Sequence, residues 1–192
     1  METGCGSGLL STYIEQFLLE GKDALTATDF SETQIELAKE RKSSVRFQVE
    51  DNMKLSFPDK SFDAYLSNLS LMIVPDENQM LREAHRVLKD GGRLSLTVIG
   101  RQQMCMTFEI VFCALATKGI FAPESSLRQY RLGTPEALKP ILETNGFTNI
   151  KMWYTPANLA FNSFEEYYGY IMQSRAGQLL EEHAATLATQ EE

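Results

Sequence analysis

The feature that most constrains this chain is a glycine-rich stretch at its start, where Gly4, Gly6 and Gly8 stand at alternate positions. Glu2 precedes the stretch, and an amphipathic run over residues 9–19 follows it. Glycine is needed where the backbone enters left-handed conformations or where a ligand approaches the main chain closely. The stretch therefore predicts a tight turn from a strand into a helix, with bare backbone facing a ligand. A plain turn without a ligand gives the same pattern, so residues further along must decide between the two.

The glycine spacing disfavours one large class of nucleotide-binding enzymes. Loops that bind dinucleotides have the pattern G-x-G-x-x-G, in which two residues precede the third glycine. In this chain a single residue separates each pair of neighbouring glycines. A nicotinamide-dependent oxidoreductase is therefore the weakest of the functional hypotheses.

Segments typical of helices and strands alternate along the chain. The predicted helices cover residues 7–20, 31–41, 77–88, 102–118, 134–146 and the stretch from 163 onwards. The predicted strands cover residues 24–28, 45–49, 62–67, 93–100, 147–154 and 158–161. Three of the helices open with a capping residue, namely Ser31, Asp76 or Ser163, followed three residues later by Gln or Glu. Thr134 is the expected cap of a fourth helix, with Pro135 at its first position. Such alternation predicts right-handed crossovers and a mainly parallel sheet with helices on both faces.

Polar residues follow the predicted strands at the edge where a ligand binds such a sheet, beyond the carboxyl ends of the strands. Asp29 follows the second strand, and its carboxylate can accept hydrogen bonds from both hydroxyls of a ribose. Asp51 and Asn52 follow the third strand and can bind an adenine edge, while Asn68 follows the fourth strand, facing the glycine loop. Each residue alone is equally typical of a solvated strand end. Together, after the glycine loop, they predict a nucleoside site.

Five stretches of the chain carry a family resemblance. They are ETGCGSG (residues 2–8), TDFS (28–31), EDN (50–52), FPDKSFD (57–63) and RVLKDGGR (86–93). In this order they resemble the successive motifs of class I S-adenosylmethionine-dependent methyltransferases. The closest resemblance is to the branch that includes ubiquinone/menaquinone-biosynthesis-like and other small-molecule methyltransferases, and it runs from residue 2 to about residue 165.

This resemblance implies a fold, a cofactor and a set of site residues. The fold is a Rossmann-like, doubly wound α/β fold with a mostly parallel seven-stranded sheet of order 3-2-1-4-5-7-6, whose last strand is antiparallel. The cofactor is S-adenosylmethionine, with S-adenosylhomocysteine as product. The glycine loop would lie under the methionine part, one carboxylate would hold the ribose, and other residues would hold or flank the adenine or lie near the methionine. The implied cofactor-binding residues are Glu2, Gly4, Cys5, Gly6, Gly8, Asp29, Phe30, Asp51, Asn52, Met53 and Asn68.

Charge and local sequence point to a small-molecule methyl acceptor. The net charge of −8 at pH 7 disfavours a nucleic-acid substrate. The sequence Asn68-Leu69-Ser70-Leu71 also departs from the Asn-Pro-Pro-aromatic motif of nucleic-acid and protein amide N-methyltransferases. We expect the acceptor pocket within residues 101–131, with a core-facing helix stripe as the alternative. The apolar residues that would line it are Met104, Met106, Phe108, Phe112, Phe121 and Tyr130.

The sequence identifies no catalytic residue and no metal ligands. A general base is needed only where the acceptor is a neutral hydroxyl or a carbon acid. His85 is expected on the surface of its helix, and His183 lies in the tail. A methyltransferase-like binding module that has lost the reaction and acts through a partner therefore stays open as the alternative function.

The start of the chain departs from the family pattern. A hydrophobic strand of about five residues should precede Glu2 at the centre of the sheet, and only Met1 of it is present. Without it the neighbouring strands would stand about 10 Å apart, and each buried unpaired backbone group would cost about 1–3 kcal/mol. We therefore expect an N-terminally truncated methyltransferase domain over residues 1–175, with its first strand largely missing, and a helical or frayed tail over 176–192.

Composition favours a soluble cytoplasmic protein. The three cysteines form no C-x-x-C pair, which fits reduced thiols inside a cell. The most apolar stretch, residues 104–115, is too short for a membrane span and contains Glu109. An organelle-targeting segment would be lost together with the missing N-terminus. The sequence does not indicate an oligomeric state.

Overall fold

Five parallel strands form the central layer of the molecule. The computed structural model describes residues 1–17, 24–101, 128–156 and 159–173, together with residues 111, 113, 116, 117, 119, 177 and 181. The strands follow the order β3-β2-β1-β4-β5 across the sheet. Their bounds are Glu2–Thr3 for β1, Thr26–Asp29 for β2, Arg46–Val49 for β3, Phe62–Asn68 for β4 and Leu88–Thr97 for β5. The predicted α/β fold and the predicted order of these five strands are confirmed.

The helices begin where the sequence places their caps. In α2 (Glu32–Lys39) the Ser31 side chain accepts a hydrogen bond from the backbone of Gln34 at 3.4 Å. In α3 (Glu77–Val87) the Asp76 carboxylate accepts from the backbone of Gln79 at 2.9 Å. Thr134 and Ser163 cap the later helices in the same way. These helices are α6 (Pro135–Thr144) and α7 (Phe164–Met172), and α1 (Leu9–Glu15) follows the glycine stretch.

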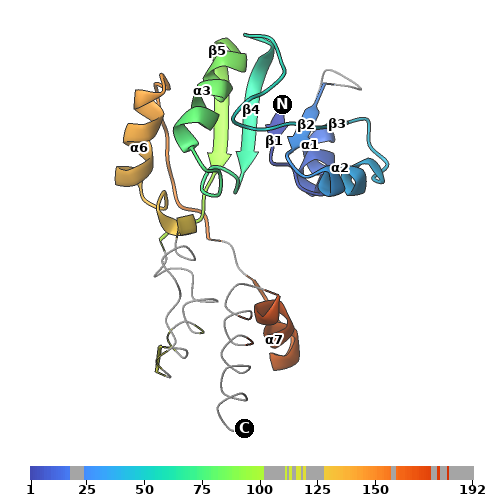
Figure 1. The fold of residues 1–192 in the computed structure, drawn as a ribbon, viewed down its shortest axis with the longest axis vertical. Helices are drawn as coiled ribbons and strands as arrows, with labels where there is room; N and C mark the ends of the chain where they lie inside the picture. Colours follow the sequence, from blue (N-terminus) through green and yellow to red (C-terminus); the bar gives the residue numbers. More distant parts are fainter. Residues whose placement is uncertain are drawn as a thin grey trace, which may run out of the picture.

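Two buried clusters lie on opposite faces of the sheet. Ala27 belongs to the cluster under α2 and pairs with Glu2, so Glu2 points to that face. Tyr65 belongs to the cluster under α3 and stands two residues before Ser67, which pairs with Thr3. Because side chains alternate along a strand, Thr3 points to the face opposite to that of Glu2. The helices therefore cover both faces, with α1 and α2 near β1 to β3 and α3 near β4 and β5 (Figure 1).

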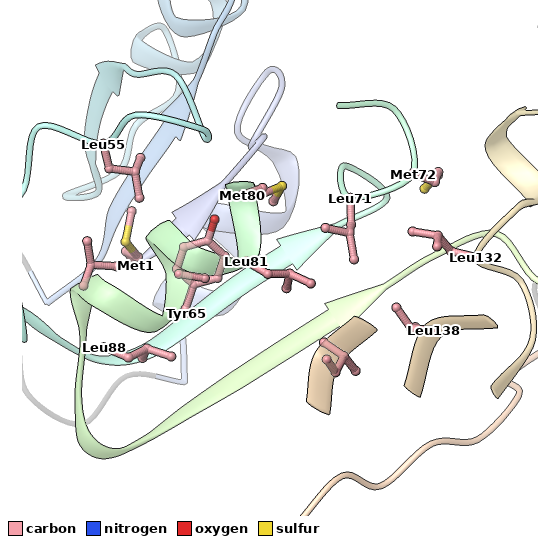
Figure 2. Packing of buried hydrophobic residues seen from close by; sticks show 13 residues of the cluster. Met1, Leu55, Tyr65, Leu71, Met72, Met80, Leu81, Leu88, Leu132 and Leu138 are labelled. Carbon is pink, nitrogen blue, oxygen red and sulfur yellow. The ribbon is translucent and has the colours of Figure 1, made fainter. Parts of the chain in front are cut away.

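The larger cluster joins α3 and α6 to the sheet, and it includes the first residue of the chain (Figure 2). The smaller cluster holds α2 against β2 and β3, with Ile14 of α1 packed on it. The fully buried or nearly buried members of the larger cluster are Met1, Leu55, Tyr65, Leu71, Met72, Met80, Leu81, Ala84, Val87, Leu88, Leu132, Leu138 and Leu142. No helix in the described ranges is both long and apolar enough to cross a membrane.

The first strand has only two residues, beside four in β2 and seven in β4, which is in keeping with the expectation that it is largely missing. Glu2 and Thr3 pair with β2 on one side and with β4 on the other. The Met1 carbonyl oxygen accepts from the backbone nitrogen of Leu66 at 2.9 Å, and the Met1 nitrogen donates to the Ala64 carbonyl at 2.7 Å. The residues expected to follow the strand therefore form it. They bridge β2 and β4 over this short length.

The acidic residue in this central strand has a hydrogen-bond partner and a raised pKa. Glu2 is 1% exposed, and its carboxylate accepts a hydrogen bond from the Ser11 hydroxyl at 2.5 Å. Loss of water around the carboxylate raises the pKa of Glu2. On the other face the Thr3 hydroxyl donates to the hydroxyl of Tyr65 at 2.9 Å. Both polar side chains of β1 thus have partners inside the protein.

The end of the sheet differs from the prediction. β5 begins at Leu88, five positions before the predicted start at residue 93, because the chain passes directly from α3 into the strand. Residues 147–156 and 159–161 contain no strand, so the predicted strands over 147–154 and 158–161 are wrong for the described residues. The apolar side chains of Phe147, Ile150 and Met152 pack on the larger cluster instead. Their pattern reflects side-chain burial without backbone pairing.

Candidate cofactor site

The glycine stretch forms the predicted tight turn between β1 and α1. Gly4, Gly6 and Gly8 all have positive φ angles, of 65°, 54° and 75°. Side-chain-bearing residues rarely adopt this left-handed conformation. Gly8 is the N-terminal cap residue of α1. The alternate glycines thus let the chain reverse direction at the carboxyl end of the central strand.

Asp29 closes one side of this turn. One of its carboxylate oxygens accepts a hydrogen bond from the backbone nitrogen of Gly6 at 2.8 Å, and the other accepts from the backbone nitrogen of Ser31 at 2.9 Å. The residue at the end of β2 therefore meets the glycine turn, as its place in the sequence predicts. Because each carboxylate oxygen can accept more than one hydrogen bond, Asp29 keeps acceptor capacity for a ligand.

The other side of the turn is closed by the segment that follows β4. The Ser70 hydroxyl donates to the carbonyl oxygens of Asn68 at 3.3 Å and Gly4 at 3.5 Å. The Asn68 side-chain oxygen accepts from the Thr97 hydroxyl at 2.5 Å, which ties the end of β4 to the end of β5. Asn68 therefore lies on the Gly4 side of the turn. Sequence reasoning missed the role of Ser70, since one serine two residues beyond a strand has no distinctive pattern.

Asn52 also lies at Gly4. Its side-chain nitrogen is 3.7 Å from the position that a Cβ atom on Gly4 would take. The neighbouring Asp51 uses its carboxylate locally, accepting from the backbone nitrogen of Met53 at 2.8 Å. Thus Gly4, Asn52, Asn68 and Ser70 gather at one end of the turn, which we call the Gly4 end. Asp29 contacts Gly6.

Arg86 of α3 holds the loop over residues 51–59 in place. Its guanidinium donates to the carbonyl oxygens of Phe57 at 2.7 Å and Leu55 at 3.0 Å. It also pairs with the Glu83 carboxylate at 2.7 Å, and that carboxylate accepts from the backbone nitrogen of Leu55 at 2.8 Å. The planar fork of arginine suits several simultaneous acceptors. The helix thereby fixes the loop that carries two of the predicted adenine-binding residues.

Replacement of Arg86 by lysine is expected to lower the free energy of unfolding by about 1–3 kcal/mol. A single ammonium group cannot donate to both loop carbonyls and Glu83 in the same geometry. Urea unfolding measures the effect. Arg82→Lys is the matched control on the same helix, because the Arg82 side chain is 55% exposed and bonds Asp76 and Gln79 at the start of that helix instead of the loop carbonyls. Equal losses in the two variants would contradict a specific role for Arg86 in holding the loop.

The remaining predicted residues have different environments. Phe30 is 76% exposed, whereas Met53 packs on the larger core cluster. Cys5 is buried, and burial raises its pKa to about 12, so its thiol stays protonated at neutral pH. Glu2 lies in the sheet, and its carboxylate accepts a hydrogen bond from Ser11.

The predicted acceptor pocket lies mostly outside the described residues. Tyr130 belongs to a short 3₁₀ helix, Arg128–Tyr130. The other five residues proposed for the pocket, and nearly all of the predicted helix over 102–118, fall outside the described ranges.

His85 is exposed on α3, in agreement with the predicted surface position, and the centre of its ring is 5.5 Å from that of Phe147. Among the described residues no group of three or more His, Cys, Asp or Glu side chains is arranged to hold a metal ion.

Comparison with known proteins identifies the family of this chain. A family model described as a methyltransferase domain matches residues 1–96, half of the chain. The chain belongs to this methyltransferase family. The resemblance to class I S-adenosylmethionine-dependent methyltransferases is thereby confirmed. The matched residues contain the glycine turn and every predicted cofactor-binding residue of this methyltransferase domain.

Two curated relatives illustrate how far the similarity extends. The 27-O-demethylrifamycin SV methyltransferase of Amycolatopsis mediterranei is 34% identical over 102 residues, which cover 50% of this chain and 36% of that protein. The demethylmenaquinone methyltransferase of Staphylococcus aureus is 32% identical over 145 residues, which cover 67% of this chain and 59% of that protein. The methyltransferase chain described here therefore matches between about a third and three fifths of the length of these relatives.

A solved structure supports the fold. The protein from Thermotoga maritima that is described as a SAM-dependent methyltransferase aligns with a TM-score of 0.57 and 24% sequence identity, and the match covers 77% of this chain and 63% of that chain. At this identity the comparison shows a shared fold and nothing about the acceptor. The Rossmann-like architecture of this methyltransferase domain is confirmed.

Proposed function

We propose that this protein transfers a methyl group from S-adenosylmethionine to a small-molecule acceptor by in-line displacement. The observation that supports the proposal best is the pair of polar groups at the glycine turn, Asp29 against Gly6 and Asn68 on the Gly4 side. The turn itself presents backbone without side chains between them. Family membership supplies the reaction type, and the cofactor supplies a methyl group already activated by a positively charged sulfur.

The residues present fit such a ligand. In this proposal Asp29 holds the ribose hydroxyls, the glycine turn lies under the methionine part, and Asp51 with the backbone of Asn52 binds the adenine. Phe30 and Met53 contact the two faces of the adenine. The high exposure of Phe30 makes its ring accessible to a ligand. Gly6 leaves open space beside Asp29, since among the described residues the Gln34 side chain, at 3.8 Å, is the one group near the position that its Cβ atom would take. The protein then acts chiefly by orienting the two reactants, an effect that can contribute several kcal/mol or more to catalysis.

The small-molecule acceptor is supported by charge and by the relatives. The net charge of −8 disfavours a polyanionic acceptor. The two relatives named above are described as acting on demethylmenaquinone and 27-O-demethylrifamycin SV, which are small molecules. Neither name identifies the acceptor of this chain, and we extend to it only the class of acceptor.

Ligand binding and product formation test the proposed function separately. Calorimetric titration is expected to show that the protein binds S-adenosylmethionine and S-adenosylhomocysteine, and that NADH gives no heat of binding. Incubation with S-adenosylmethionine carrying a labelled methyl group and a panel of quinols, phenols and macrolides is then expected to label at least one acceptor. Absence of S-adenosylhomocysteine binding would overturn the proposal. Binding without transfer to any acceptor would instead support the non-catalytic binding module.

A further inference from the structure

The glycine turn lies along one side of α2. The position that a Cβ atom on Gly8 would take is 3.0 Å from the Cβ of Ala38, and the corresponding position on Gly6 is 3.8 Å from the Gln34 side-chain oxygen. Gln34 and Ala38 stand four residues apart and therefore on one face of the helix. Arg41 follows the C-terminal cap of the helix, and its backbone nitrogen donates to the Ala38 carbonyl at 3.1 Å. The last turn of α2 thereby brings a charged side chain to the glycine turn.

The guanidinium of Arg41 bonds the residue that stands between these two glycines. Its Nε donates to the Ser7 carbonyl oxygen, and its Nη2 donates to the Ser7 hydroxyl oxygen at 3.4 Å. The peptide group that follows Ser7 is bonded on its other side as well, because the Gly8 nitrogen donates to the Cys5 carbonyl at 3.0 Å. The peptide between Ser7 and Gly8 is therefore held at both of its polar groups, and Arg41 supplies one of the two bonds.

A turn made of glycines depends on such contacts for its order. Gly6 and Gly8 have no side chains that could pack and fix them, and glycine loses more conformational freedom on ordering than any other residue. Two charged side chains from other elements bond this turn, Asp29 at the Gly6 nitrogen and Arg41 at Ser7. The proposed function places Asp29 on the ligand but gives no part to Arg41.

We propose that Arg41 is a positioning residue of the cofactor site, which orders the glycine turn before S-adenosylmethionine binds. This inference rests on the proposed function. A site that is ordered in advance loses less conformational freedom on binding, and its affinity is higher for that reason. Arg41 thus acts on the affinity for the cofactor through Ser7 and the backbone of the turn.

The alternative is that Arg41 only stabilises the fold, and Glu15 provides a comparison for it. The segment 41–44 that reaches Ser7 through Arg41 also holds the other end of α1. There the Glu15 carboxylate accepts from the Ser43 hydroxyl and from the Ser44 backbone nitrogen, both at 2.7 Å. Of these two connections between the same segments, the one through Arg41 is at the glycine turn. Loss of the Glu15 carboxylate therefore shows how a structural contact of this segment affects binding.

The test is to measure ligand affinity and the order of the turn in matched variants. Arg41→Gln is expected to raise the dissociation constant for S-adenosylhomocysteine at least about fivefold. In the ligand-free protein it is expected to speed amide hydrogen exchange in the peptide that covers residues 4–8. Lys42→Gln removes the same charge from the exposed neighbouring residue. This variant and Glu15→Ala should leave the dissociation constant within about twofold and exchange at the turn unchanged. Calorimetry at a temperature where every variant is folded, with mass spectrometry for the exchange, gives both results.

Each outcome bears on one proposal. Unchanged affinity in Arg41→Gln would overturn the inference, as would equal weakening in Arg41→Gln and Glu15→Ala. Weaker binding with unchanged exchange at the turn would also overturn it, because the turn would then be ordered without Arg41. If the wild-type protein does not bind S-adenosylhomocysteine, the proposed function fails and the inference fails with it. If wild-type binding is normal and only the Arg41 results differ from expectation, the proposed function stands.

A conservative variant provides a second test of the same contact. Arg41→Lys retains one donor for the Ser7 carbonyl but loses the fork that reaches both Ser7 oxygens. Its dissociation constant is expected to lie between those of the wild type and Arg41→Gln. If Arg41→Gln does not fold, Arg41→Lys replaces it, with an expected weakening of at least about twofold and faster exchange at the turn. Wild-type values for both measurements in Arg41→Lys would then overturn the inference.

Discussion

Replacing Gly4 with alanine is expected to lower the free energy of unfolding by about 2–5 kcal/mol. Two effects add. Gly4 has a φ angle of 65°, and a Cβ atom built on it would lie 1.9 Å from the Ser70 hydroxyl oxygen and 2.8 Å from the Ser70 Cβ. Left-handed backbone costs a side-chain-bearing residue about 1–2 kcal/mol, and the overlap must be relieved by moving the end of β4 away from the turn. Urea unfolding measures the loss.

Gly91→Ala is the matched control for this variant. Gly91 has a similar φ angle of 76°, but nothing lies within 4 Å of the position that its Cβ would take. It therefore reports the conformational cost alone, about 1–2 kcal/mol. The additional loss of unfolding free energy in Gly4→Ala, relative to Gly91→Ala, measures the overlap with Ser70. We expect this additional loss to disappear when Gly4→Ala is introduced into the Ser70→Gly variant. If the two glycine variants lose the same stability, Ser70 does not stand against Gly4 as described.

Replacing Asp29 with alanine is expected to raise the dissociation constant for S-adenosylhomocysteine at least about tenfold, equivalent to about 1.4 kcal/mol. The variant removes the proposed ribose acceptor and also two hydrogen bonds within the site, those from the backbone nitrogens of Gly6 and Ser31. The glycine turn loses its attachment to β2 and binds a ligand with less preorganisation. Calorimetric titration at constant salt gives the affinity.

Asp63→Ala provides the comparison for Asp29→Ala. Asp63 is also an aspartate on a strand of the sheet, but it lies near the start of β4, is exposed and pairs with Lys89 at 2.8 Å. Because the proposed site lies beyond the carboxyl ends of the strands, the affinity of this variant should match that of the wild type. Unchanged affinity in Asp29→Ala would remove Asp29 from the site.

Local signals in the sequence were sufficient for much of the fold. Ser31, Asp76, Thr134 and Ser163 cap the helices that they predict. In each case a short side chain accepts a hydrogen bond from a backbone nitrogen three residues later. Because this contact is local, the capping sequence predicts the start of a helix without knowledge of the tertiary structure. The meeting of Asp29 with the glycine turn was predictable for a similar reason, since parallel strands bring their carboxyl ends to one edge.

Features that depend on the packing of distant segments were not predictable in this way. The sequence places the first strand before Glu2, whereas Glu2 and Thr3 themselves pair with β2 and β4, because pairing is decided by neighbours on both sides. Residues 147–154 have a strand-like pattern but form no strand, since their apolar side chains reach the core without a backbone ladder. The approach of Ser70 and Asn52 to Gly4 likewise joins three separate loops.

The crystal structure of the S-adenosylhomocysteine complex tests the central claim most directly. We predict that the ligand spans the glycine turn, with its ribose hydroxyls within hydrogen-bond distance of the Asp29 carboxylate and its methionine part beside Gly4. A ligand bound away from the turn, or one with its ribose at the Gly4 end, would contradict the account.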